Sequence, residues 1–255
     1  MRLWWVSPNN QMSKYDIVAM GDNHGDLGCS DTLDQVMSFV KRVNPKYRVH
    51  LGDNWDFRWA RRGVDKDSSE AREGVQEDLE SGIKWIERYK PTHFLFGNHD
   101  DRIRQIIHNT DSIKTKEDMQ EIQDKMMRTL RKVGCKVIKP YSVKHGRIVI
   151  GPLTFIHGFS HGQNALLKDA RAFGSPGGGF TMGHLHRLEQ LNNESFEGGA
   201  SWLCGCAMRI DEAEYAMRHS STLRWQNGFM YYQVDGDSYI GKQAHRFGKG
   251  WYFPA

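Results

Sequence analysis

Short apolar runs that lead into glycine-containing polar loops recur in the first part of the chain. Residues 16–20, 48–51 and 92–96 each form such a run, and each is followed by glycine next to Asp or Asn. Apolar runs of this length between turn residues are typical of buried strands. The pattern therefore predicts three strands with polar side chains at their carboxyl ends.

Apolar residues at helical spacing occupy the segments between these runs. The segment between Asp31 and Pro45 has one apolar face, and these two residues are typical of a helix start and a helix stop. Residues 69–89 and 116–133 show the same amphipathic pattern. Strands that alternate with helices in this way predict an α/β fold.

The second half of the chain is richer in short strands and shows no internal repeat. The predicted strands there are 136–138, 147–150, 153–156, 180–182 and 228–234, with one brief helix at 164–173. We expect an α/β fold of two packed mixed β-sheets flanked by helices. It would form a single domain over residues 1–255, with a strand-rich C-terminal part from about 188 to 255.

Composition limits the class of protein. The mean hydropathy is −0.67, and no apolar run approaches the 20 residues that a membrane-spanning helix needs. The N-terminal apolar patch is too short for a signal peptide, and four cysteines in 255 residues do not make a disulfide framework. We therefore expect a cytoplasmic protein that does not contact membranes. Its net charge of +4 is compatible with a phosphate-rich partner.

Five loops that follow predicted strands carry side chains suited to metal ions. They contain Asp22 and His24; Asp53 and Asp56; Asn98 and His99; His157; and His184 and His186. Sites in open α/β sheets form outside the carboxyl ends of the strands, where all five loops fall. Carboxylate, imidazole and amide donors suit ions such as Mn²⁺, Fe and Zn²⁺. Each loop alone is a weak signal, but the five together indicate a metal site.

In this order the motifs resemble those of the calcineurin-like metallophosphoesterase superfamily: D-x-H, G-D-x-x-D, G-N-H-[DE], a lone His and G-H-x-H. The resemblance covers about residues 16–187 and implies a four-layer sandwich that holds two divalent metal ions, with Mn²⁺ as the first expectation and Fe, Zn or Ni as alternatives. One ion would be held by Asp22, His24, Asp53 and His186. The other would be held by Asp53, Asn98, His157 and His184.

The resemblance also implies the chemistry. Asp53 would bridge the two ions, and a water shared between them would ionise near neutral pH and attack phosphorus. His99 would face the leaving group as a proton donor, oriented by Asp56. The lone-His position has two candidates; His157 is preferred because it directly follows a strand and precedes glycine. We expect His161 to lie outside the ligands or to face substrate.

The sequence departs from the phosphoprotein phosphatases of this superfamily. Those enzymes carry Arg-Gly after the second Asp and usually Arg before G-N-H-E, whereas this chain has Phe57-Arg58 and Phe96 there, and Asp100 in place of Glu. Two arginines that would grip phosphate are therefore missing from the motifs. This argues against a phosphoprotein substrate, although Arg58 could replace part of their function.

Two segments mix basic and aromatic residues in the way that nucleic-acid-binding proteins do. One contains Arg58, Arg61 and Arg62, and the other is the tail from 242 to 253. The alternative is a solvated loop and a C-terminal strand whose rings enter the core. Cys204 and Cys206 lack a second cysteine pair at zinc spacing, so we expect thiols packed within a strand.

Together with these patterns, the resemblance implies a dinuclear-metal-dependent phosphoesterase. A phosphodiesterase or nuclease acting on nucleic-acid or nucleotide diesters, DNA or RNA included, is the leading hypothesis. The alternative enzyme is a phosphomonoesterase acting on a small phosphorylated metabolite. A metal-stabilised binding module without activity is the hypothesis from another class. The sequence leaves the substrate and the oligomeric state open.

Overall fold

Two β-sheets form the centre of the protein. In the computed structural model, which describes residues 14–61, 74–213 and 220–254, the larger sheet has seven strands in the order β12-β11-β10-β1-β2-β3-β4. The smaller sheet has five, in the order β5-β6-β7-β9-β8. Both are mixed: β1 to β4 run parallel while β10 is antiparallel to β1, and β6, β7 and β9 run parallel between antiparallel β5 and β8.

Strands and helices alternate along the first part of the chain. The strands are β1 (Lys14–Met20), β2 (Tyr47–His50), β3 (His93–Leu95), β4 (Val137–Lys139), β5 (Arg147–Ile150), β6 (Leu153–Ile156), β7 (Gly179–Met182), β8 (Leu188–Asn192), β9 (Ala200–Cys204), β10 (Gly228–Asp235), β11 (Ser238–Phe247) and β12 (Gly250–Tyr252). The α-helices are α1 (Ser30–Val43), α3 (Val75–Tyr89), α4 (Arg102–Asn109), α5 (Ile113–Lys132) and α6 (Ala165–Phe173). Helix α4 has no counterpart among the sequence predictions, and residues 69–73 of the predicted helix 69–89 lie outside the described residues.

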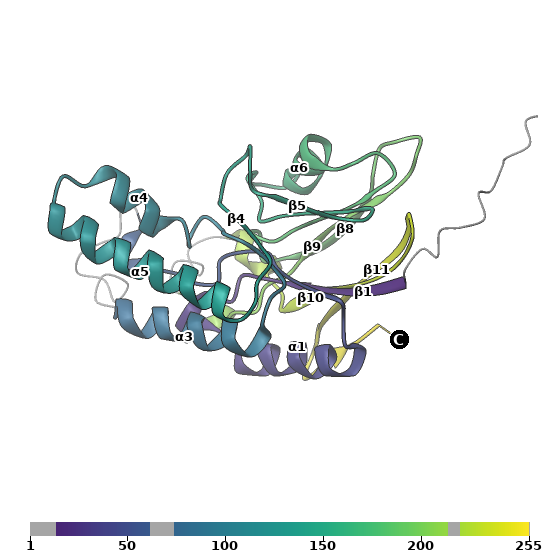
Figure 1. Cartoon of the computed structure of the whole chain (residues 1–255). Coiled ribbons are helices and arrows are strands. Elements are labelled where there is room, and N and C mark those ends of the chain that lie inside the picture. Colours follow the sequence, from purple (N-terminus) through teal and green to yellow (C-terminus); the bar gives the residue numbers. More distant parts are fainter. Residues whose placement is uncertain (1–13, 62–73, 214–219, 255) are drawn as a thin grey trace, which may run out of the picture.

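The order of layers follows from the alternation of side chains along β1. Ile17 and Ala19 face the second sheet, whereas Val18 and Met20 face α1 and α3. Figure 1 shows α1 and α3 below the larger sheet and α6 above the smaller one. The protein is therefore an α/β sandwich of two mixed sheets flanked by helices, as predicted.

The described residues from 188 onward contribute to both sheets. Strands β8 and β9 belong to the smaller sheet, while β10 lies between β1 and β11 in the larger one. Near the C-terminus, Trp251 and Phe253 pack against the cluster that includes Phe39 of α1. Two rings of the tail therefore join the core, as in the alternative that the sequence left open, whereas Phe247 and Tyr252 are exposed.

The topology brings the five polar loops to one edge of the sandwich. The first three loops leave the carboxyl ends of β1, β2 and β3, which are parallel neighbours. The other two leave β6 and β7, parallel neighbours in the second sheet. None of the helices in the described ranges is long and apolar enough to cross a membrane.

Candidate dinuclear metal site

Backbone hydrogen bonds hold the first two loops together. The amide of Asp22 donates to the carbonyl of Gly52 at 2.9 Å, and the amide of His24 donates to that of Asp53 at 3.0 Å. The third loop approaches closely at Gly97, where an added Cβ would lie 2.0 Å from Oδ1 of Asp53. Only glycine therefore allows the third loop to pack against the Asp53 carboxylate.

Five predicted ligands have a backbone conformation that side chains other than glycine rarely adopt. Within the described ranges, eight non-glycine residues have positive φ angles, and the five are Asp22, His24, Asp53, His184 and His186. Each such residue costs about 1–3 kcal/mol and persists only where its surroundings enforce the conformation. Strain of this kind collects at functional sites, and here it coincides with the predicted ligands.

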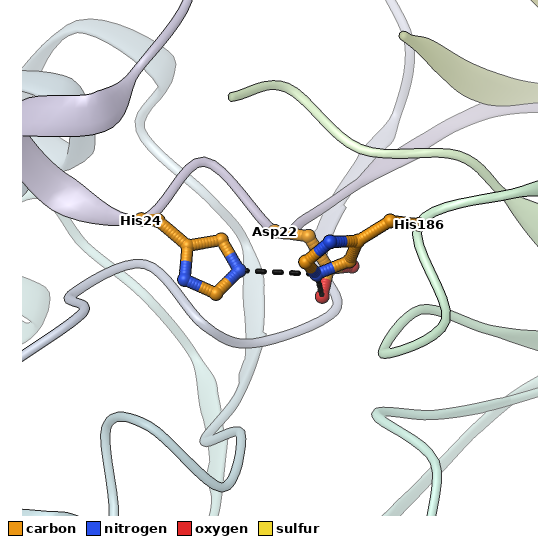
Figure 2. A group of neighbouring side chains, drawn as sticks. All are labelled: Asp22, His24 and His186. Carbon is orange, nitrogen blue, oxygen red and sulfur yellow. Dashed lines mark hydrogen bonds and ion pairs between the residues drawn. The ribbon is translucent and has the colours of Figure 1, made fainter. Parts of the chain in front are cut away.

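Asp22, His24 and His186 form the first cluster. One ligand atom from each lies within 4.8 Å of the others. Figure 2 shows the three side chains converging, with His186 coming from a different segment of the chain than the other two. Nε2 of His24 and Nε2 of His186 are 3.1 Å apart, and Nε2 of His186 is 3.2 Å from Oδ1 of Asp22.

Asp53, His157 and His184 form the second cluster by the same criterion. Nε2 of His157 lies 2.9 Å from Oδ1 of Asn98 and 3.3 Å from Oδ2 of Asp53. The same Asp53 oxygen lies 4.0 Å from Nε2 of His24 in the first cluster. Asp53 therefore belongs to the second cluster and also lies beside the first.

The donor atoms of both clusters fit divalent cations. Nδ1 of His24 donates to Asp56 at 2.8 Å and Nδ1 of His157 donates to the Leu51 carbonyl at 2.9 Å, so in the neutral rings both Nε2 atoms carry lone pairs. Both Nε2 atoms face other ligand-type atoms, and a proton or a metal cation shared between them would satisfy these contacts. The set has carboxylate, amide and imidazole donors and no thiolate, which suits Mn²⁺, Fe or Zn²⁺.

The electrostatics of the buried side chains agree with this fit. Burial would raise the pKa of Asp53, but His157 and His99 outweigh it and hold that pKa well below its usual range. Burial lowers the pKa of His157, yet Asp53 and Asp22 raise it to about 9. The carboxylates therefore favour positive charge at the place where the second cluster converges.

Asp56, His24 and His99 form a third group by the same criterion, in which Asp56 holds both rings. Oδ1 of Asp56 accepts from Nδ1 of both His24 and His99, and its Oδ2 accepts from Arg58 at 3.0 Å. His99 is thus held by Asp56, in the arrangement that the resemblance implies. Burial, followed by the charge of Arg102, lowers the pKa of His99 to about 4, so the ring is neutral at pH 7 in the metal-free protein.

Two further carboxylates hold the loops by accepting hydrogen bonds from their backbone amides. Asp78, near the start of α3, accepts from the backbone amides of Asp56 at 3.2 Å and Phe57 at 2.8 Å. Asp100 accepts from the amides of Trp55 at 2.9 Å and Gly97 at 2.8 Å, which links the second loop to the third. The sequence analysis did not predict these roles, because an acidic residue near a helix start or in a loop is usually solvated.

The predicted substrate contacts lie in different surroundings. Arg58 is buried and donates to Asp56 and to both carboxylate oxygens of Asp26, so its contacts favour a role in holding Asp56. His161 is exposed, and its Nδ1 lies 3.1 Å from Nε2 of His184. Arg61 is partly exposed, and Arg62 lies outside the described residues.

Cys204 and Cys206 are buried. Neither belongs to a group of ligand-type side chains within the described ranges that could hold a metal ion. Burial raises the pKa of both thiols, which keeps them protonated. Both therefore act as packed apolar side chains; Cys204 lies within β9 as expected, whereas Cys206 lies beyond that strand in an isolated bridge with Asn227.

Comparison with protein families gives the same assignment as the motifs. The family model described as calcineurin-like phosphoesterase matches residues 15–207. The chain belongs to this family. No curated protein matches the chain at a significant level.

Among solved structures, a metallophosphoesterase from Sphaerobacter thermophilus has 14% sequence identity and a TM-score of 0.49, with 91% of this chain and 88% of that chain covered. Vacuolar protein sorting 29 from Cryptosporidium parvum has 11% identity and a TM-score of 0.47, with coverage of 94% and 95%. The phosphoesterase Yfce from E. coli has 14% identity and a TM-score of 0.38, with coverage of 89% and 97%.

Proposed function

We propose that this protein is a dinuclear-metal-dependent phosphoesterase that hydrolyses phosphodiesters. The observation that carries the proposal is the position of Asp53, whose carboxylate stands between two clusters of ligand-type side chains. When bound, two divalent ions would supply a nucleophilic water at neutral pH and would neutralise charge on the phosphate. Mn²⁺ is the ion we propose, with Fe, Zn²⁺ and Ni²⁺ as the alternatives.

The residues of the chain itself would bind the ions and handle the leaving group. Asp22, His24, Asp53 and His186 would hold one ion, and Asp53, Asn98, His157 and His184 the other. His99 would deliver a proton to the leaving oxygen from Nε2 as the imidazolium, because the neutral ring, whose Nδ1 donates to Asp56, carries no proton on Nε2. The bond to Asp56 keeps the ring in one orientation. The burial of Asp53 and Asp56 excludes water from the carboxylates that hold these side chains.

The charges beside the clusters favour a diester over a monoester. Arg58 is neutralised by Asp26 and Asp56, which leaves less positive charge for the dianion of a monoester than the two motif arginines of phosphoprotein phosphatases would provide. A diester carries a single negative charge. A nucleotide or nucleic-acid diester is the substrate class we propose, supported by the half-buried ring of Trp225, whose centroid lies 4.2 Å from that of His186.

The test is hydrolysis by the Mn²⁺-loaded protein of a bis-aryl phosphate, an aryl monophosphate, and single- and double-stranded DNA and RNA. Asp53→Asn should remove most of the activity, whereas Asp111→Asn, a surface control, should not. Faster hydrolysis of the monoester than of the diester would favour the phosphomonoesterase. A protein that binds metal but cleaves none of these substrates would be a binding module.

A further inference from the structure

The side chain of Arg102 lies beside His99 although no sequence motif points to it. Arg102 is the first residue of α4, three positions after His99. Its Nη1 donates to the backbone carbonyl of Asp56 at 2.7 Å and approaches that of Phe57 at 3.3 Å. Its Nη2 lies 3.3 Å from Nε2 of His99. The second loop therefore holds the guanidinium against Nε2 of His99, the atom that in the proposed function faces the leaving group.

The charge of Arg102 is compensated less than that of the neighbouring arginines. Arg58 makes close ion pairs with Asp56 and Asp26, at 3.0 and 2.8 Å. Arg104 donates from Nε and Nη2 to the two carboxylate oxygens of Asp101. Arg102, by contrast, makes its close contacts with two backbone carbonyls and an imidazole, and Oδ1 of Asp56 lies 3.9 Å from its Nη1.

A guanidinium in this position can bind phosphate without losing its present contacts. Each Nη atom carries two N–H groups, so one on Nη2 can point at His99 while the other is directed elsewhere. The side chain is 12% exposed, so the hydrogen bonds it makes are poorly screened by solvent. Its planar, permanently charged group is the one that proteins use most for phosphate recognition.

We propose that Arg102 binds a phosphate oxygen of the ester, next to the leaving-group oxygen that His99 faces. The proposal rests on the phosphoesterase function given above. Arg102, in the first turn of α4, would be a phosphate-binding arginine of the kind that the motifs lack. The ligand class is a phosphate ester anion, and inorganic phosphate is the probe for it.

The test compares the affinity of the Mn²⁺-loaded protein for inorganic phosphate in variants of two arginines on the same helix. Arg102→Ala should weaken phosphate binding by about 10- to 100-fold, the loss expected for one hydrogen bond to a charged group. Arg102→Gln should lose nearly as much phosphate affinity, because its side chain carries no charge. Its amide can still donate to the Asp56 carbonyl, so the contact with the second loop is kept. Arg102→Lys should recover part of the affinity, and Arg104→Ala should bind phosphate as the unaltered protein does.

Kinetics and metal content separate substrate binding from a structural role. If Arg102 binds phosphate, the Ala and Gln variants keep their metal content, and kcat/KM for the bis-aryl phosphate falls with the phosphate affinity. Added guanidinium should restore part of the activity of Arg102→Ala. Phosphate affinities within twofold of the unaltered protein in both variants would overturn the proposal, and so would a failure of all three Arg102 variants to fold.

The outcomes also separate this proposal from the proposed function. If the unaltered protein binds Mn²⁺ and phosphate but hydrolyses no ester, the function fails, while the comparison of phosphate affinities still decides the role of Arg102. If the Mn²⁺-loaded protein hydrolyses esters and phosphate affinity does not depend on Arg102, only the present proposal fails. A metal-loaded protein that binds no phosphate overturns the role of Arg102 directly.

Discussion

The Nε2 atoms of His24 and His186 face each other at 3.1 Å. Because Nδ1 of His24 donates to Asp56, the neutral ring directs the lone pair of Nε2 at the second imidazole. Nε2 of His186 in turn lies 3.2 Å from Oδ1 of Asp22, and the buried Nδ1 of His186 has no hydrogen-bond partner among the residues that the structure describes. A proton on Nε2 of His186 or a metal cation between the three side chains would satisfy this geometry. The donor set suits a divalent ion, which motivates the first prediction.

The purified protein should hold two divalent ions per chain, and their removal should lower its melting temperature. Ion binding stabilises the folded state by mass action, so a tightly bound pair should be worth on the order of 5–10 °C. Elemental analysis and thermal unfolding with Mn²⁺ or with EDTA measure both effects. The metal site would be disproved by a protein that contains no ion and is neither stabilised nor activated by added Mn²⁺.

Gly97→Ala should disturb the site through packing alone. The new methyl group would lie 2.0 Å from Oδ1 of Asp53 and 2.5 Å from its backbone nitrogen, so the third loop has to move. We expect a loss of about 1–3 kcal/mol in the free energy of unfolding together with reduced metal content. Gly74→Ala is the control, since its Cβ would meet nothing closer than 3.9 Å. Unchanged metal content in Gly97→Ala would contradict the close approach.

His99→Ala should separate proton donation from metal binding. The variant should keep its metal ions and lose roughly 10²–10⁴-fold in turnover on esters with poor leaving groups. An aryl ester whose leaving group needs no proton should be affected much less. Equal losses on the two esters, or loss of metal, would show that His99 has a different role.

Acidification should destabilise the fold through His50. Its Nδ1 accepts from the amide of Gly52 and its Nε2 donates to Asn23, so a second ring proton would face an N–H group. Burial lowers the pKa of His50 to about 3, whereas the unfolded chain takes up this proton near pH 6.5. The stabilisation is therefore complete above pH 6.5 and falls by about 1.4 kcal/mol per pH unit as pH drops below 6.5.

Urea unfolding between pH 7.5 and 5 measures this loss. His50→Gln should reduce the slope of stability against pH, while the exposed His108→Gln should not. A slope in His50→Gln equal to that of the unaltered protein would mean that other groups cause the acid sensitivity.

Salt dependence should decide between nucleic acid and a small ester as substrate. If Arg61 and Arg62 contact a nucleic-acid backbone, replacing both with Gln should reduce the magnitude of the slope of log affinity against log salt concentration by about two. Hydrolysis of a bis-aryl phosphate should persist, because its chemistry lies at the predicted ligands. An enzyme that is insensitive to salt, hydrolyses small esters and cuts no DNA or RNA would favour the phosphomonoesterase.

The sequence predicted the layers of the fold and the side chains that converge at its edge. Short apolar runs, amphipathic helices and glycine-containing loops are local signals, and parallel strands in one sheet place their carboxyl ends together. Helix α4 was missed because its eight residues follow a loop motif directly and offer few periodic positions. The position of β10 between β1 and β11 was also beyond prediction, because strand pairing across more than 200 residues leaves no local signal.

What the sequence by itself determined was the identity of the polar residues at the strand ends; what only the tertiary structure decided was the direction of the arginines. Arg58 follows the second motif but is turned inward by Asp26 and Asp56. Arg102, outside every motif, lies against His99 because α4 begins beside the second loop. A long, flexible cation takes its position from whichever carboxylates and carbonyls lie nearest in space, and those neighbours come from distant parts of the chain.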